Sequence, residues 1–104
     1  MAQRIGGYVQ RPSRRDVNEK EIVDALRKIG ASVSRLKDRD LNARGLPDLL
    51  VGYKGKTILI EVKVEGRPGL SSGQKEWHQN WQGDAAYVVS SADQAVKLCN
   101  AVAD

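Results

Sequence analysis

The stretch DLLVGYKGKTILIEVK, residues 48–63, decides the fold because it has the pattern of a β-hairpin. Residues 48–53 are mostly apolar and predict one strand, and along 57–64 Ile58, Ile60 and Val62 alternate with their neighbours and predict a second. Lys54-Gly55 between them is a short hairpin connection. A two-residue turn pairs Tyr53 with Lys56, and this register places Asp48 directly opposite Glu61. We therefore expect two carboxylates on one face of the hairpin, with Cβ atoms about 5 Å apart.

Two like charges directly across a sheet repel each other, so the pair predicts a cation between them. Lys63 points to the same side as Glu61, whereas Val62 points to the core and offers its backbone carbonyl as a further ligand. Mg²⁺ binds through one or two carboxylates together with water and phosphate oxygens. The sequence has a single His and a single Cys, so a zinc site is not expected.

These residues predict phosphodiester hydrolysis by a metal-activated water. Lys63 is placed to orient the nucleophile, to stabilise developing negative charge, or to accept a proton if its pKa is depressed. The alternative is an ordinary hairpin with a surface Asp and a Glu–Lys pair, because Glu-x-Lys is common in strands.

Working outward, apolar periodicity predicts helices over 19–29, 71–81 and 92–102, and further strands over 31–36 and 85–90. Asn18 with Glu21, and Ser71 with Gln74, have the spacing of helix-starting capping boxes, and Gly30 ends the first helix. The order is α-β-β-β-α-β-α, an α/β fold with a mixed sheet flanked by helices. A right-handed crossover makes the last strand parallel to the third.

The chain has 104 residues, enough for one domain, with 40% hydrophobic and 29% charged residues as in ordinary globular proteins. Residues 1–15 contain four arginines and no acid, so they carry the whole net charge of +4 and predict a basic arm before a domain over 16–104. This arm is either a phosphate contact or a solvated tail. No apolar run could span a membrane and no secretory signal is visible, so we expect a reducing cytoplasm, with Cys99 as a buried hydrophobe.

The segments Gly45-Leu46-Pro47-Asp48 and Ile60-Glu61-Val62-Lys63 match the PD-(D/E)xK nuclease pattern. Together with the 45–53 run and the helix start at Leu70-Ser71-x-x-Gln74, they resemble the VRR-NUC family, in particular its small stand-alone phage and bacterial members. The resemblance covers about residues 18–102.

This resemblance implies a restriction-endonuclease-like fold and DNA cleavage that depends on Mg²⁺ or Mn²⁺, in a bacterial or phage-infected cell. It implies Asp48, Glu61 and the Val62 carbonyl as metal ligands, and Gln74 beside the catalytic site. It also implies an acidic residue from the first helix, for which Glu19 and Glu21 are both candidates, with a slight preference for Glu21.

The stand-alone members resemble Holliday-junction resolvases that act as homodimers, which suits symmetric cuts in branched DNA. A flap or nicking nuclease with the same site, and a non-catalytic nucleic-acid-binding module, are the alternatives. Basic side chains near the expected site are candidate phosphate contacts or solvated charges: Arg35, Lys37, Arg39, Arg44 and Arg67. Trp77 and Trp81 are expected in the core or at a dimer interface, and His78 in a packing or surface role.

Overall fold

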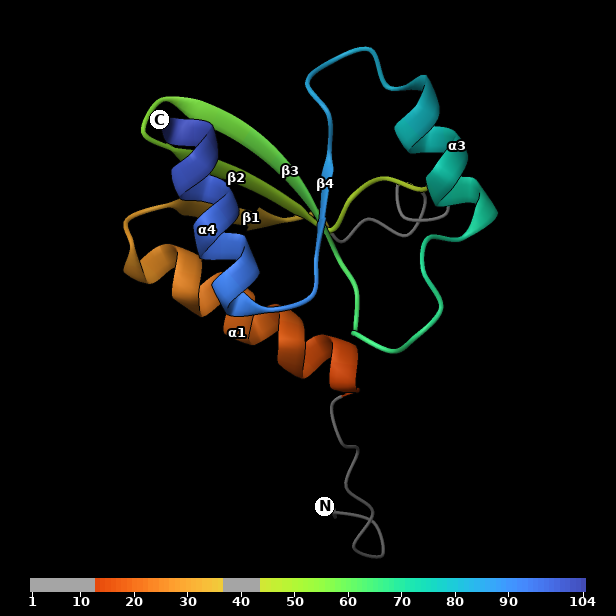
Figure 1. The fold of residues 1–104 in the computed structure, drawn as a ribbon, viewed down its shortest axis with the longest axis horizontal. Coiled ribbons are helices and arrows are strands. Elements are labelled where there is room, and N and C mark those ends of the chain that lie inside the picture. Colours follow the sequence, from red (N-terminus) through yellow and green to blue (C-terminus); the bar gives the residue numbers. More distant parts are fainter. Residues whose placement is uncertain (1–12, 37–43) are drawn as a thin grey trace, which may run out of the picture.

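The computed structural model of the chain describes residues 13–36 and 44–104, and their order of elements is the expected one. The bounds are α1 (Arg14–Lys28), β1 (Ser32–Arg35), β2 (Leu49–Tyr53), β3 (Lys56–Val62), α3 (Ser72–Asn80), β4 (Tyr87–Val89) and α4 (Ala92–Ala103). The prediction of an α-β-β-β-α-β-α fold is therefore confirmed, with a mixed sheet and flanking helices (Figure 1).

The sheet has four strands in the order β1-β2-β3-β4, of which the first three are antiparallel and β4 is parallel to β3. Tyr53 pairs with Lys56 as predicted, so the register of the hairpin is confirmed. Lys54 and Gly55 both have positive φ, 48° and 79°, as a type I′ turn requires. This turn sets which side chains share a face of the sheet.

One face of the sheet carries the core. It packs against α1 and α4, which lie next to each other across it, as Figure 1 shows. The strand residues buried on this face are Val33, Leu49, Val51, Tyr53, Ile58, Ile60, Val62 and Val89. Cys99 of α4 is buried in this core, as expected.

The opposite face is less covered, since its side chains include the exposed Leu50 and Val88. Helix α3 stands apart from α1 and α4 (Figure 1), and none of its residues is buried. Glu61 lies on this second face, because it is two residues from Leu59 along β3 and Leu59 pairs with Leu50.

Helix α1 begins earlier than predicted. Its N-cap is Ser13, whose hydroxyl accepts a hydrogen bond from the Asp16 backbone N–H, so the prediction of an N-cap at Asn18 is wrong. The Asn18 side chain instead donates to backbone carbonyls outside the helix. Arg14 and Arg15, assigned to the basic arm from sequence, thus lie on the first turn of α1, whereas residues 1–12 lie outside the described part of the chain.

At the other end of α1, Gly30 has φ 97° and follows the C-cap Ile29, which confirms the predicted end of the helix. Within residues 13–36 and 44–104, no helix is long and apolar enough to cross a membrane.

Candidate active site

Two buried carboxylates meet where β2 begins and β3 ends. Asp48, directly before β2, is 7% exposed, and Glu61 in β3 is fully buried. Asp48 Oδ2 accepts a hydrogen bond from the Val62 backbone N–H at 2.8 Å. One oxygen of Glu61, Oε1, is buried and has no hydrogen-bond partner among the described residues. The predicted face-to-face pair of acids is therefore present, with one oxygen left for a further partner.

The electrostatics of this pair favour a proton or a cation. Burial first, and then the negative charge of Asp48 and a hydrogen bond with its carboxyl group, raise the pKa of Glu61 from 4.5 to about 8. The positive charges of Lys63 and Arg15 lower this pKa, but by less than the other effects raise it. Near neutral pH Glu61 therefore favours its protonated form unless a cation takes the place of the proton.

Lys63 and Gln74 complete the surroundings of Glu61. Lys63 Nζ lies 3.6 Å from Glu61 Oε2 and donates to Gln74 Oε1 at 2.8 Å, while Gln74 Nε2 donates to Glu61 Oε2 at 2.9 Å. Gln74 Oε1 also accepts from the Ser71 backbone N–H, so the capping box of α3 is formed as predicted. The same side chain therefore starts α3 and fixes α3 to the acid on β3.

A close backbone approach holds α3 against the segment that leads to Asp48. Gly45 has φ 89°, and a Cβ atom placed on it would lie 2.5 Å from the carbonyl oxygen of Gly73 in α3. Only glycine combines this conformation with this contact at no steric cost. The backbone conformation and the close contact with α3 therefore both require glycine at position 45.

Arg15 is a member of the site that the sequence analysis missed. Its guanidinium forms an ion pair with Asp48 Oδ1 from the first turn of α1. Burial alone would lower the pKa of Arg15, but the hydrogen bond to Asp48 and the charges of Asp48, Glu61 and Glu19 together raise it. The signal for it was the Ser13-x-x-Asp16 pattern, which starts α1 early enough to include Arg15.

The two candidate glutamates of the first helix occupy different surroundings. Glu19 is buried, 4% exposed, and its Oε2 lies 3.3 Å from Arg35 Nε. Glu21 is exposed and lines another cavity, so of the two candidates only Glu19 is buried, and its charge acts on Arg15, the partner of Asp48. Among residues 13–36 and 44–104, however, no three His, Cys, Asp or Glu side chains form a cluster that could hold a metal ion.

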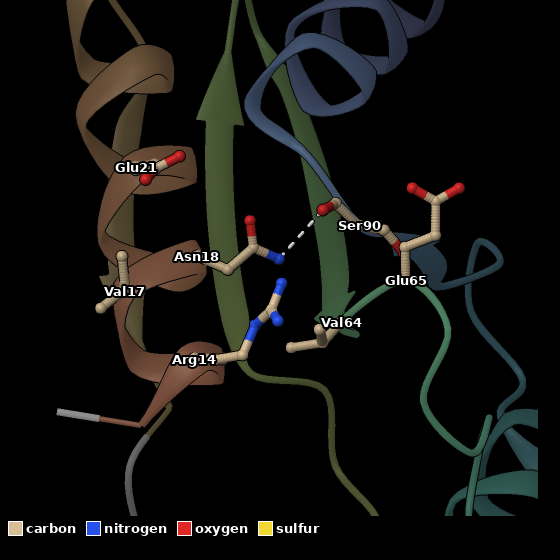
Figure 2. A pocket seen from close by; sticks show the side chains of 7 residues that line it. All are labelled: Arg14, Val17, Asn18, Glu21, Val64, Glu65 and Ser90. Atoms are coloured by element: carbon tan, nitrogen blue, oxygen red, sulfur yellow. Dashed lines mark hydrogen bonds between the residues drawn. The ribbon is translucent and has the colours of Figure 1, made fainter.

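The cavity of about 390 Å³ beside Glu21 lies between α1 and the ends of β3 and β4 (Figure 2). Asn18 crosses it and donates to the carbonyls of Ser90, at 3.0 Å, and Lys63, at 3.3 Å. This amide fixes the backbone of Lys63 relative to α1. Asn18 is thus a positioning residue for the site, in a role its predicted N-cap function did not suggest.

The basic side chains expected near the site are only partly brought to it. Arg35 is paired with Glu19, whereas Arg44 is exposed beside α3. Arg67 lines a cavity together with Lys63. Lys37 and Arg39 lie outside the described residues.

The aromatic side chains of α3 are not in the core of this chain. Trp77 and Trp81 stack on each other, with ring centroids 4.9 Å apart and an angle of 17° between their planes, and Trp81 is 44% exposed. His78 packs edge-on against Trp77, with its centroid 5.5 Å away, which agrees with the expected packing role. The core alternative for the tryptophans is therefore wrong, because α3 does not pack into the core.

The residues present fit a hard divalent cation such as Mg²⁺ or Mn²⁺. Among residues 13–36 and 44–104, Glu61 Oε1 is a buried acceptor without a donor, and the Glu61 carboxyl group interacts with that of Asp48. Carboxylate oxygens are the ligands that such ions prefer. The Val62 N–H points to Asp48, and in a strand the carbonyl of the same residue points to the same side, which makes it a further oxygen ligand in reach.

Comparison with known proteins bears on the fold that carries these residues. No family model and no curated protein matches the sequence. Among solved structures, one described as a VRR_NUC domain superposes with a TM-score of 0.67 and 26% sequence identity, over 86% of this chain and 97% of that one. The similarity thus extends over nearly all of both chains. The resemblance stated from the sequence is therefore confirmed, and the chain has the fold of the VRR-NUC nuclease family.

Proposed function

We propose that this chain is a DNA endonuclease that depends on Mg²⁺ or Mn²⁺. The observation that carries the proposal is the buried pair Asp48 and Glu61 with an unpartnered oxygen, on a chain similar to a VRR_NUC domain. A divalent ion bound there would neutralise charge on the scissile phosphate and acidify a water molecule. Asp48, Glu61 and the Val62 carbonyl are its proposed ligands.

The roles of the remaining residues follow from their contacts. Lys63 keeps its ammonium group 3.6 Å from Glu61 and 2.8 Å from Gln74, which holds it at the acid pair. From there it can donate to a phosphate oxygen as negative charge develops. Gln74 orients both Lys63 and Glu61, while Glu19 holds Arg35 and adds negative charge near Arg15.

The substrate that we propose is branched DNA, cut by a homodimer as a Holliday-junction resolvase cuts it. Two symmetric incisions require two sites related by a twofold axis, and a homodimer supplies the Asp48–Glu61 pair twice. A second copy has an apolar surface available, because Leu50 is 39% and Val88 47% exposed on the sheet face opposite α1 and α4.

Replacing Asp48 with Asn tests the catalytic proposal. The amide keeps one oxygen for the Val62 N–H but removes the charge, so cleavage with Mg²⁺ or Mn²⁺ should fall by at least about a hundredfold, while DNA binding in EDTA persists. The control variant is Lys97→Gln, which removes an exposed charge on α4 and should cleave DNA at the wild-type rate. Cleavage by the Asn variant at the wild-type rate would exclude the proposed metal site.

Labelled four-way junction, flap and plain duplex DNA test the substrate. A junction resolvase nicks two opposed strands of the junction at symmetric positions. Cleavage of one strand near a flap, with the junction untouched, would assign the same site to a flap nuclease. Binding without cleavage under every metal condition would leave only a nucleic-acid-binding module.

A further inference from the structure

A second cavity next to the acid pair has a strongly basic lining. It has a volume of about 320 Å³ and is lined by Ser13, Arg14, Arg15, Lys63, Val64, Arg67 and Pro68. Four of these seven residues are cationic at neutral pH, and none of them is acidic. Because water occupies roughly 30 Å³ per molecule, the cavity has room for a phosphate group and several water molecules.

The four cations come from two separate segments of the chain. Arg14 and Arg15 lie on the first turn of α1, and Lys63 and Arg67 lie just beyond the end of β3. Asp48 and Glu61 already pair with Arg15 and Lys63, but among the described residues Arg14 and Arg67 form no ion pair, so the lining keeps positive charge that favours a further anion. Phosphate oxygens accept hydrogen bonds from several guanidinium and ammonium groups at once, so a phosphate is the anion that this lining suits.

Arg15 belongs to both sites. It lines the basic cavity, and its guanidinium is paired with Asp48 Oδ1, one of the carboxylates proposed to hold the metal. A divalent cation at Asp48 and a guanidinium on the same carboxylate repel each other. The Arg15 side chain is 45% exposed, so it has the space to turn from the carboxylate into the cavity.

We propose that the cavity lined by Arg14, Arg15, Lys63 and Arg67 binds a DNA backbone phosphate adjacent to the one that is cut, and that Arg15 reaches it by leaving Asp48 when a metal binds there. The inference rests on the proposed function, because it takes DNA as the ligand and Asp48 as the metal carboxylate. Metal and DNA then favour each other's binding, because Arg15 pairs with Asp48 in their absence and with a phosphate in their presence.

The phosphate site is tested by DNA binding in EDTA, where cleavage does not interfere. Arg67→Gln should weaken binding of a labelled four-way junction and of plain duplex roughly three- to tenfold at about 0.1 M salt, and should reduce the slope of log K against log salt by about 1. Lys97→Gln removes an exposed charge remote from the cavity and should bind like the wild type. Equal affinity and equal slope for the two variants would overturn the proposed site.

The exchange of Arg15 is tested by Mn²⁺ binding, measured by calorimetry and by the electron paramagnetic resonance signal of free Mn²⁺. Arg15→Gln should bind Mn²⁺ several-fold more tightly than the wild type without DNA, because the competing cation is gone. Added DNA should then increase its Mn²⁺ affinity less than it does for the wild type. Unchanged or weaker Mn²⁺ binding by a folded Arg15→Gln variant would exclude the exchange.

Failure of this inference and failure of the proposed function give different results. If the wild type cleaves DNA and Asp48→Asn does not, while Arg67→Gln binds DNA like Lys97→Gln, only the phosphate site is refuted. If the wild type cleaves no DNA with either metal, the nuclease proposal is refuted, and the comparison in EDTA still decides whether the cavity binds phosphate.

Discussion

Replacing Glu61 with Gln should stabilise the metal-free protein while removing its response to metal. Glu61 is fully buried beside Asp48, and these surroundings raise its pKa from 4.5 to about 8. Gln is nearly isosteric, keeps an oxygen for the Gln74 amide, and can donate from its own amide to the Asp48 carboxylate. The variant thus replaces a buried repulsion with a hydrogen bond.

The magnitude follows from the pKa of Glu61. A rise from 4.5 to about 8 corresponds to at most about 5 kcal/mol, at about 1.4 kcal/mol per pKa unit. Relaxation and entry of water reduce such costs for buried ions, so we expect the free energy of unfolding to rise by about 2–3 kcal/mol at pH 8. For a domain of this size, that corresponds to an increase in Tm of roughly 10–20 °C.

The sign of the pH dependence is specific to an acid whose pKa is raised on folding. Between about pH 4.5 and about pH 8 the folded state holds a proton on Glu61 that the unfolded state has lost. The contribution of Glu61 to stability therefore falls as pH rises through this window and is constant above it. The Gln variant should lack this fall, so its advantage over the wild type should grow from pH 5 to pH 8.

Thermal unfolding followed by circular dichroism in EDTA measures this effect, with Glu76→Gln as the control because Glu76 is an exposed acid on α3. Added Mn²⁺ at about 100 times its Kd should then stabilise the wild type by about 2.7 kcal/mol and the Glu61 variant by much less. A Glu61→Gln variant no more stable than Glu76→Gln at pH 8, or one stabilised by Mn²⁺ as the wild type is, would refute the reasoning.

Three further substitutions test the close approach of α3, the hydrogen bonds of Asn18 and the proposed dimer interface. Gly45→Ala should lower the Tm and strongly reduce cleavage, because the alanine Cβ would lie 2.5 Å from the Gly73 carbonyl oxygen. A φ of 89° also costs residues other than glycine roughly 1–3 kcal/mol of strain. A wild-type Tm together with a wild-type cleavage rate would exclude a tight approach of α3. Asn18→Ala should lower the free energy of unfolding, measured by chemical denaturation, by about 1–2 kcal/mol, because two carbonyls at the ends of β3 and β4 lose their donor. An unchanged free energy of unfolding would show that water replaces the amide. Leu50→Glu should shift the protein toward monomer in light scattering if the open face of the sheet forms the dimer, and an unchanged mass would place the interface elsewhere.

The hairpin could be predicted from sequence because its information is local. Lys54-Gly55 determines the turn, the turn determines the register, and the register brings Asp48 and Glu61 together. The capping box at Ser71 and Gln74 is equally local and was also predicted. In both cases residues within a few positions of one another decide the conformation.

The start of α1 was mispredicted because the sequence contains two competing capping signals. Ser13-x-x-Asp16 and Asn18-x-x-Glu21 both have the capping-box spacing, and only the first is used as a helix start. The second fails because the Asn18 amide forms hydrogen bonds with carbonyls 45 and 72 residues away along the chain. Such long-range partners are decided by the folded structure and leave no local signal, whereas Arg15 was missed because the Ser13-x-x-Asp16 signal was passed over in favour of Asn18.

The helical period of α1 decides which of the two candidate glutamates is buried. A helix that begins at Arg14 places Arg15, Glu19, Ile22 and Leu26 along one face, and the latter two are fully buried in the core. Arg15 and Glu19 therefore extend the buried stripe toward the sheet end that carries Asp48. Glu21 falls outside this stripe, so its exposure follows from the phase of the helix.

Glu61 links the attachment of α3 to the proposed chemistry of the site. Helix α3 buries none of its residues, and the described hydrogen bonds that join it to the sheet run through Gln74 to Lys63 and Glu61. Glu61 is thus both a destabilising buried acid and the point to which α3 is attached. A substitution chosen for stability alone would remove this charge, whereas the proposed metal site requires it. A divalent ion at the proposed site would favour the ionised form of Glu61 and so strengthen its hydrogen bond from Gln74, which ties the attachment of α3 to the chemistry of the acid pair.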